Sequence, residues 1–355
     1  MTATVEAEVL VERRGNLGHI LLNRPRALNS LTPGMVATIA STLAEWHDDD
    51  VVQVVAISGA GERGLCAGGD IVGIYSDLVA ASGATARFWA DEYRLNSAIA
   101  NYPKPVVAIM DGLVLGGGVG ISAHASVRVV TERSKVGMPE VGIGFVPDVG
   151  GTYLLSRAPG ELGTHFALTG ASMTGPEAIA AGFADHEVAS ADLPDLLVAL
   201  QGGDAAGSVA RFAVPRPVPV PRAWIDECYS SDDALEILSR LEASSSDDAR
   251  EAGASIRAKS PTSVVVTLAS LRRAALLPSL ESALDQEYRV GLRIIEGGEM
   301  IEGIRAQVID KDRTPQWNPA SIAEVDDAAV DRHFADLGDR ELGLQSTTAT
   351  QRSAS

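Results

Sequence analysis

The chain has 355 residues, of which 46% are hydrophobic and 21% charged. This composition is typical of a globular enzyme with one large core and an appendage, or with two domains. A formal net charge of −18 argues against nucleic acid and anionic membranes as partners, because both would be repelled. Cys66 and Cys228 are too few for a disulfide framework, residues 1–14 lack the apolar segment of a secretion signal, and no run approaches the roughly 20 apolar residues of a membrane-spanning helix. We therefore expect a cytoplasmic protein.

The N-terminal part of the chain alternates strand and helix signals. Residues 5–11 and Leu17–Leu22 are rich in apolar and β-branched residues, and the turn signal between them predicts a hairpin. Thr32 followed by Pro33 is typical of a helix start, which predicts a helix to about Trp46. Residues 51–57 and Val106–Met110 are continuous apolar runs of the kind found in buried strands. The alternation predicts an α/β fold.

An acidic residue interrupts the apolar face of a predicted helix over residues 84–101. Phe88, Leu95 and Ile99 fall on one face of this helix, and Glu92 falls among them. A carboxylate in an apolar stripe is costly to bury unless it has a partner or a chemical role. Glu92 is therefore a candidate site residue, although a side chain that reaches solvent at the edge of the stripe would give the same pattern.

The composition changes near residue 200. Residues 201–208 are glycine-rich and residues 214–222 carry a proline at every second or third position, which predicts a semi-rigid linker or wrapped segment. Helical periods follow over residues 231–241, 247–259, 263–274 and 279–295. We expect residues 1–200 to form the core with the active site, residues 201–343 to be mainly helical, and residues 344–355 to be a disordered tail.

Chemical signals concentrate in two glycine-rich turns and two acids. The turns span residues 64–70 and 116–120, and Glu140 and Asp148 follow the second turn, eight positions apart. Glycine lets the backbone approach a ligand closely because no Cβ stands in the way. Bare amide donors can hold an oxyanion, while fixed carboxylates can move protons or attack a carbonyl. Together they favour acyl chemistry.

Three other interpretations explain these residues less well. Gly118-x-Gly120-x-x-Ala123 matches a dinucleotide fingerprint, but three successive glycines make a chance match easy and no second nucleotide-binding unit follows. Cys66 between two glycines resembles a nucleophile elbow with Asp185 and His186 downstream, but glycines prolong the loop where the elbow needs a helix. A non-catalytic module would explain each turn alone, but not both turns together with three placed carboxylates.

The two turns carry a family resemblance. Cys66-Ala67-Gly68-Gly69-Asp70 and Gly116-Gly117-Gly118 resemble the two oxyanion-hole loops of the enoyl-CoA hydratase/isomerase (crotonase) superfamily, and Leu22-Asn23-Arg24-Pro25 resembles its N-terminal strand signature. The resemblance implies a spiral core of ββα repeats and a thioester oxygen held between the amides of Gly69 and Gly117. It also implies an acyl-CoA substrate with no separate cofactor and no metal. The segments that it implies for CoA contribute Arg24, Arg26, Ala67, Gly68 and Asp70.

The acidic residues narrow the resemblance to one branch of the superfamily. Hydratases of the superfamily use two glutamates; Glu140 stands at the position of the second, but Gly120 stands at the position of the first. Glu140 with Asp148 instead resembles the 3-hydroxyisobutyryl-CoA hydrolases of the superfamily, as do Glu92 and the segment 302–312. This branch implies hydrolysis of a short branched 3-hydroxyacyl-CoA, as in valine breakdown, with Glu92, Gly117, Glu140 and Asp148 binding substrate. Lys311 either reaches the phosphates of CoA or is an ordinary surface lysine. Relatives also form homo-oligomers, and an enoyl-CoA hydratase or isomerase is the alternative.

Overall fold

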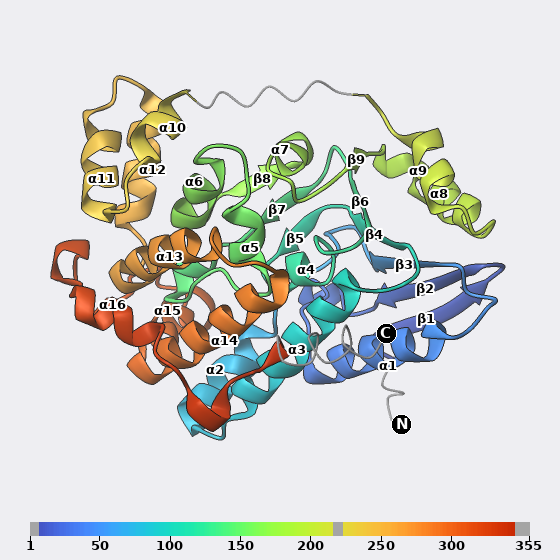
Figure 1. Cartoon of the computed structure of the whole chain (residues 1–355), viewed down its shortest axis with the longest axis horizontal. Coiled ribbons are helices and arrows are strands. Elements are labelled where there is room, and N and C mark those ends of the chain that lie inside the picture. The colour runs from blue at the N-terminus through green and yellow to red at the C-terminus, as the bar shows by residue number, and fades with distance from the viewer. Residues whose placement is uncertain (1–6, 216–222, 345–355) are drawn as a thin grey trace. The chain divides into compact units, whose positions relative to one another are not determined.

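The computed structural model describes residues 7–215 and 223–344, and Figure 1 shows its helices and strands. The chain forms two compact units, each assembled from three separate stretches. The first unit contains Met1–Asp70, Arg94–Val136 and Met173–Val218, and the second contains Ile71–Tyr93, Gly137–Ser172 and Pro219–Ser355. The composition predicted a single boundary near residue 200, and this division differs from it. Composition shows where residue usage changes along the chain, but it does not show which segments pack together. The predicted tail lies outside the described residues from position 345 onward.

A six-stranded sheet organises the first unit. Its strand order is β1-β2-β3-β4-β6-β9, with β1 antiparallel to β2 and the remaining neighbours parallel. The strands span Val9–Arg14, Leu17–Leu22, Val54–Gly59, Val106–Met110, Val127–Val130 and His186–Glu187. The hairpin, the buried strands and the α/β class are therefore confirmed. A smaller sheet has the order β5-β7-β8 and consists of the three-residue strands Leu113–Leu115, Lys135–Gly137 and Ser172–Thr174.

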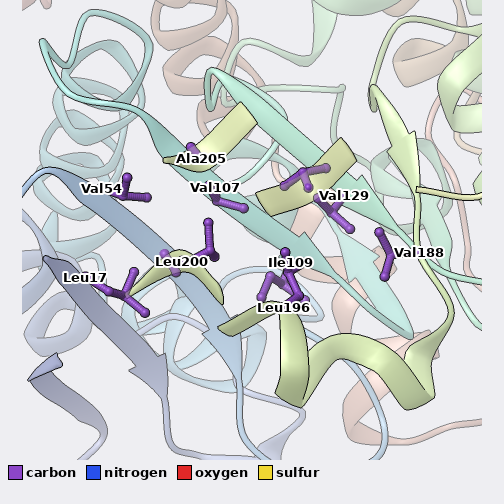
Figure 2. Packing of buried hydrophobic residues seen from close by; sticks show 11 residues of the cluster. Leu17, Val54, Val107, Ile109, Val129, Val188, Leu196, Leu200 and Ala205 are labelled. Carbon is purple, nitrogen blue, oxygen red and sulfur yellow. The ribbon is translucent and has the colours of Figure 1, made fainter. Parts of the chain in front are cut away.

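Two helices cover one face of the six-stranded sheet. Helices α8 (Leu193–Leu200) and α9 (Ala205–Phe212) pack their apolar residues against alternate positions of the strands, as Figure 2 shows. The sheet contributes Leu17, Val54, Ala56, Val107, Ile109 and Val129 to this layer, together with Val188 just after β9. Helix α9 begins within the glycine-rich residues 201–208, whereas most of the linker predicted over residues 214–222 lies outside the described residues. Asp204 accepts a hydrogen bond from Gly207 N–H and thereby begins α9.

The remaining helices of the first unit follow local start signals. Helix α1 (Pro33–His47) begins as predicted, because Thr32 Oγ1 accepts a hydrogen bond from Met35 N–H at 3.1 Å. Helix α7 (Gly175–Ala180) begins with a capping box between Thr174 and Glu177. The glycine turn after β5 opens only the short helix α4 (Gly117–Gly120). Short 3-10 turns at Pro25–Ala27 and Ser190–Asp192 complete the unit.

The second unit is helical. Helix α2 (Ile71–Ala80) precedes α3 (Ala84–Ala100), of which residues 84–93 belong to this unit. The helices that follow are α5 (Gly151–Leu155), α6 (Leu162–Thr169), α10 (Ala223–Tyr229), α11 (Ala234–Ala243), α12 (Asp247–Arg257), α13 (Pro261–Ala274), α14 (Leu280–Gly297), α15 (Glu299–Ile304) and α16 (Asp327–His333). Four shorter helical turns span Glu140–Ile143 (η2), Arg305–Ile309, Ile322–Glu324 and Gly338–Arg340. The mainly helical C-terminal region is confirmed.

Polar caps determine where the C-terminal helices begin. The residues before α11, α12, α13 and α14 each accept a backbone N–H of the first turn through the side chain, and these are Asp233, Ser246, Ser260 and Ser279. Figure 1 shows α11 and α12 side by side. Within residues 7–215 and 223–344, no helix is both long and apolar enough to cross a bilayer.

Candidate active site

The two glycine-rich turns lie against each other in the first unit. Cys66 N–H donates to Leu113 O at 3.1 Å, and Leu115 N–H donates back to Cys66 O at 2.9 Å. These hydrogen bonds join the first turn to strand β5, which leads directly into the second turn. The two loops that the sequence singled out, 46 or more positions apart in the chain, are thus brought together as one structure.

Only glycine fits where the loops touch. A Cβ on Gly118 would lie 2.4 Å from Cys66 O, and a Cβ on Gly64 would lie 2.1 Å from Leu113 N. Gly64 also has φ +148°, a backbone conformation that side chains rarely adopt. Glycine at these positions is therefore required by close backbone approach, as the sequence indicated.

Each loop presents an amide that the fold does not use. Leu31 pairs with the residues on both sides of Gly69, donating to Gly68 O at 2.8 Å and accepting from Asp70 N–H at 2.9 Å, so Gly69 N–H points away from Leu31. Gly117 is the first residue of α4, where an N–H has no partner in its own helix. In the described part of the chain neither amide donates a hydrogen bond. A Cβ on Gly68 would lie 3.8 Å from Gly117 N, which places the loops close together at this point.

The residues expected to contact CoA also lie in the first unit. Arg24 is tied to its own surroundings, with its guanidinium 3.0 Å from Glu8 Oε1 and 3.1 Å from Asp70 Oδ2, and it donates to Ser30 O at 2.6 Å. Arg26 is exposed, whereas Ala67 and Gly68 belong to the loop described above. Arg24 and Asp70 thus stabilise the loop as an ion pair. Their contact with CoA stays a prediction.

A set of buried carboxyl groups in the second unit includes all three acids that the sequence singled out. Glu92 lies on α3, Glu140 begins η2, and Asp148 lies in the turn before α5. Their exposed fractions are 2%, 7% and 6%, and another carboxyl group, Glu287 on α14, is 1% exposed. Tyr93, fully buried beside Glu92 in the chain, donates its hydroxyl to Asp148 Oδ2 at 2.7 Å. The three predicted acids are therefore all buried in one compact unit.

Burial and mutual repulsion raise the proton affinity of this carboxyl cluster. Desolvation raises the pKa of Glu92 and of Glu140 well above the ordinary value, and the charge of Asp148 raises both pKa values further. Burial raises the pKa of Asp148 to about 7, although the Tyr93 hydrogen bond acts in the opposite direction. Clusters of this kind hold protons at neutral pH and are typical of acid–base sites.

Two oxygens of the cluster have no partner. Glu92 Oε1 and Glu140 Oε2 are buried and receive no hydrogen bond from the described residues. Buried polar atoms of folded proteins are nearly always paired, so unpaired ones point to a ligand or water that completes them. For Glu92, the buried oxygen argues against the alternative that its carboxylate reaches solvent at the edge of the helix face.

Local turns hold Glu140 and Asp148 in place. Pro139 precedes the 3-10 turn η2, and Gly144 follows it with φ +73°, where a Cβ would lie 2.6 Å from Glu299 O. After Asp148 the chain turns through Val149 at φ +52° and Gly150 at φ +80°. A β-branched residue in the left-handed region is a conformational outlier, and such outliers cluster at functional sites.

Sequence reasoning missed Glu287 and Tyr93. Glu287 accepts hydrogen bonds from Gly150 N–H at 2.6 Å, Thr152 N–H at 2.8 Å and Thr152 Oγ1 at 2.5 Å. The signal that identified Glu92 is present here too, because Glu287 interrupts the buried apolar stripe of α14 that includes Leu284 and Val290. Applied to α14, the same criterion would have found it.

The cysteine alternative is not supported. Asp185 forms an ion pair with Arg128 at 2.6 Å, and its pKa is lowered by this guanidinium despite partial burial. Asp185 is therefore engaged as a structural partner and does not serve Cys66. Within the described residues, no group of three or more His, Cys, Asp or Glu side chains could hold a metal ion.

Comparisons with known proteins identify the family of this chain. A rat relative named 3-hydroxyisobutyryl-CoA hydrolase, mitochondrial, is 40% identical over 96% of this chain and 91% of its own. A structure of a carnitinyl-CoA dehydratase from Mycobacterium thermoresistibile is 50% identical, with a TM-score of 0.92 over 96% of this chain and 99% of its own. An enoyl-CoA hydratase structure from Rhodobacter sphaeroides is 42% identical, with a TM-score of 0.88 over 95% of this chain and 99% of its own. The enoyl-CoA hydratase/isomerase family model matches residues 17–334, so the chain belongs to the enoyl-CoA hydratase/isomerase family.

Proposed function

We propose that this protein hydrolyses 3-hydroxyisobutyryl-CoA to 3-hydroxyisobutyrate and CoA, a reaction of valine breakdown. Relatives named for this hydrolase, from rat and human among others, are 36–40% identical over nearly the whole chain. The observation that carries the proposal is the pair Glu140 and Asp148, buried in one unit, where the charge of Asp148 raises the pKa of Glu140. Gly120 stands where a hydratase has its other glutamate.

The glycine loops would stabilise the developing negative charge. We assign the amides of Gly69 and Gly117 to the thioester oxygen, because both are otherwise unused. As the carbonyl carbon is attacked, its oxygen gains a full negative charge, and the hydrogen bonds strengthen in the transition state. Each such donor contributes on the order of 3 kcal/mol to transition-state stabilisation.

Glu140 would carry out the attack by one of two routes. In the first, its carboxylate attacks the thioester carbon, the C–S bond breaks to release CoA, and water then cleaves the resulting anhydride to the acid and free Glu140. In the second, Glu140 removes a proton from a water that attacks the same carbon directly. Both routes use an ionised Glu140 and consume one water per thioester.

Asp148 and Glu92 would complete the acidic site. A carboxyl whose pKa is raised to about 7 is partly protonated at neutral pH, so Asp148 can donate a hydrogen bond or a proton as well as accept one. Glu92 presents an unpaired buried oxygen and is suited to accept a hydrogen bond from the 3-hydroxyl of the substrate. This role of Glu92 would favour 3-hydroxyacyl substrates over acyl substrates that lack the hydroxyl.

Hydratase or dehydratase chemistry is the alternative, because the two solved structures compared above are described as a dehydratase and a hydratase. Addition or removal of water across a double bond needs a proton donor and a proton acceptor on the same face of the substrate. Gly120 cannot supply one of these groups. The names of the curated relatives favour hydrolysis instead.

A substrate panel tests the proposal. Purified protein should release free thiol from 3-hydroxyisobutyryl-CoA and should leave the conjugated absorbance of crotonyl-CoA unchanged. Glu140→Gln should reduce thiol release by at least about 100-fold with its circular dichroism and melting temperature retained. Glu296→Gln, an exposed glutamate paired with Arg293 and Arg340, is the control and should behave as wild type. Loss of crotonyl-CoA absorbance without thiol release would instead identify a hydratase.

The location and assembly of the protein stay predictions. The curated relatives are named as mitochondrial proteins, which does not support the cytoplasmic location expected from composition. A homo-oligomer is expected from the family alone.

A further inference from the structure

We propose that Glu287 is a positioning residue for Asp148: its carboxylate holds the turn that carries Asp148 and sets the electrostatic environment of the acidic cluster. No role in the reaction was expected for Glu287 from the sequence. Its role in turnover rests on the proposed function, whereas its effect on the ionisation of Glu140 can be measured without turnover.

The contacts of Glu287 are concentrated on the turn. Oε2 accepts Gly150 N–H at 2.6 Å, and Oε1 accepts both Thr152 N–H and Thr152 Oγ1 at 2.8 and 2.5 Å. All three partners donate, so an ionised carboxylate satisfies them best. The same turn is closed by Gly151 N–H, which donates to Asp148 O at 2.6 Å. Glu287 thus fixes the backbone two and four positions after Asp148.

The turn needs such support because its backbone is unfavourable. Val149 adopts φ +52°, a conformation that β-branched residues avoid, and it lies between Asp148 and the first residue that Glu287 holds. Strained conformations persist only when the surroundings fix them. With Tyr93 binding its side chain and Glu287 binding its backbone neighbours, Asp148 is fixed from two elements, α3 and α14.

A residue that only accepted hydrogen bonds from this turn would not need an ionisable side chain such as that of Glu287. Glu287 is 1% exposed, and no cation is paired with it among the described residues. Its charge raises the pKa of Tyr93 and of Glu140, the charge of Asp148 raises the pKa of Glu287 itself, and Glu92 is also part of the cluster. Burial raises the pKa of Glu287 to about 8, against the effect of its three donors. Its negative charge in turn raises the pKa of Glu140.

Glu287→Gln separates this role from simple stabilisation. Glutamine keeps the size of the side chain but removes the charge, and its amide nitrogen cannot accept the donors on one side. We expect kcat for thiol release to fall about 10- to 100-fold with KM changed less than about threefold. The part of the pH–rate profile at and above about pH 8, where Glu287 ionises in the wild type, should move to lower pH, because a repelling charge is gone. Glu296→Gln on the same helix is the matched control and should change neither.

Thr152→Val provides a milder variant if Glu287→Gln fails to fold. It removes only the hydroxyl donor to Glu287 Oε1 and keeps both backbone hydrogen bonds. We expect a folded protein with a smaller loss of kcat, about 3- to 10-fold, and with KM retained. If Glu287→Gln folds, wild-type kcat and pH profile in that variant would overturn the proposal; if it does not fold, a folded Thr152→Val with wild-type kcat would overturn it.

Infrared titration keeps this proposal independent of the substrate assignment. The carboxyl band of protonated Glu140, whose pKa the charge of Glu287 raises, can be identified by its absence in Glu140→Gln and followed with pH. Its midpoint should lie lower in Glu287→Gln than in wild type. An unchanged midpoint would overturn the electrostatic role of Glu287 even in an active enzyme. Absence of thiol release from wild-type protein would overturn only the proposed function.

Discussion

Asp148 and Glu140 influence each other's ionisation, and this makes the pH dependence of the reaction informative. The charge of Asp148 is the second cause, after desolvation, of the raised pKa of Glu140. Because either route of attack needs ionised Glu140, activity should rise with pH as the cluster loses its proton. The apparent pKa of this rise belongs to the coupled groups and not to one residue.

Asp148→Asn should move this rise to lower pH. Removing the neighbouring charge lowers the pKa of Glu140, so the residual activity of the variant should reach its plateau at a lower pH than in wild type, while kcat itself falls because Asp148 no longer exchanges a proton. Thiol release measured from pH 5 to 9 gives both quantities. A rise that stays at the same pH would mean that Asp148 carries no charge in the active form.

The sequence identified the acids through a simple rule and missed others for equally simple reasons. Glu92 was found because it interrupts an apolar helical face, and Glu140 and Asp148 because they follow prolines in glycine-rich turns. Glu287 satisfies the same rule as Glu92, but 139 residues separate it from Asp148, and no pattern in the chain indicates that α14 reaches this turn. Contacts between residues so far apart in sequence can be identified only from the folded structure.

Among the elements, the two glycine loops tolerate an added side-chain atom least. Their backbones approach so closely at Gly118 that an added methyl group would overlap Cys66 O at 2.4 Å. The clash involves backbone on both sides, so neither partner can rotate away. The loops would have to separate, which would displace the Gly117 amide next in the chain.

Gly118→Ala should therefore abolish most activity. We expect thiol release to fall by at least about 100-fold, the loss seen when one oxyanion donor is removed, and we expect the melting temperature to drop. Gly34→Ala in α1 is the matched control, since its Cβ would meet nothing nearer than Thr32 Oγ1 at 3.7 Å. Full activity of Gly118→Ala would show that the Gly117 amide does not act on the thioester.

Element boundaries were predictable where a cap or a buried strand marks them. Thr32 opens α1, Thr174 opens α7, and Val106–Met110 is a strand with the predicted bounds. The strands β5, β7 and β8 have three residues each, which is too short for any periodic signal. Helix α9 was obscured by the glycines just before it, although Asp204 supplied its cap.

At the scale of the whole molecule, the buried acids oppose stability at high pH. Glu92, Glu140, Asp148 and Glu287 all have raised pKa values, to about 7 for Asp148 and about 8 for Glu287. Between about pH 4.5 and 8 the folded protein therefore binds more protons than the unfolded chain, so the free energy of unfolding falls as pH rises. Each tenfold increase in proton affinity corresponds to about 1.4 kcal/mol, so ionising the buried Asp148 alone costs a few kcal/mol of stability.

Urea unfolding at pH 5, 7 and 8.5 should show this decline. The free energy of unfolding should be highest near pH 5 and lower at pH 8.5. Glu92→Gln should flatten the decline, because a group that resists ionisation in the folded state has been replaced by a neutral one. A wild-type protein that is more stable at pH 8.5 than at pH 5 would contradict the raised proton affinities.

The hydrogen bonds from the Asp148 turn to α14 have a consequence for how such chains diverge. A shortened descendant ending at Val218 would keep both glycine loops, yet its Gly150 and Thr152 amides would have lost the acceptor that Glu287 provides. The C-terminal helices are therefore needed to hold the turn that follows Asp148. We expect chimeras that exchange these helices between relatives to be active only when the exchanged segment supplies a glutamate at the position of Glu287.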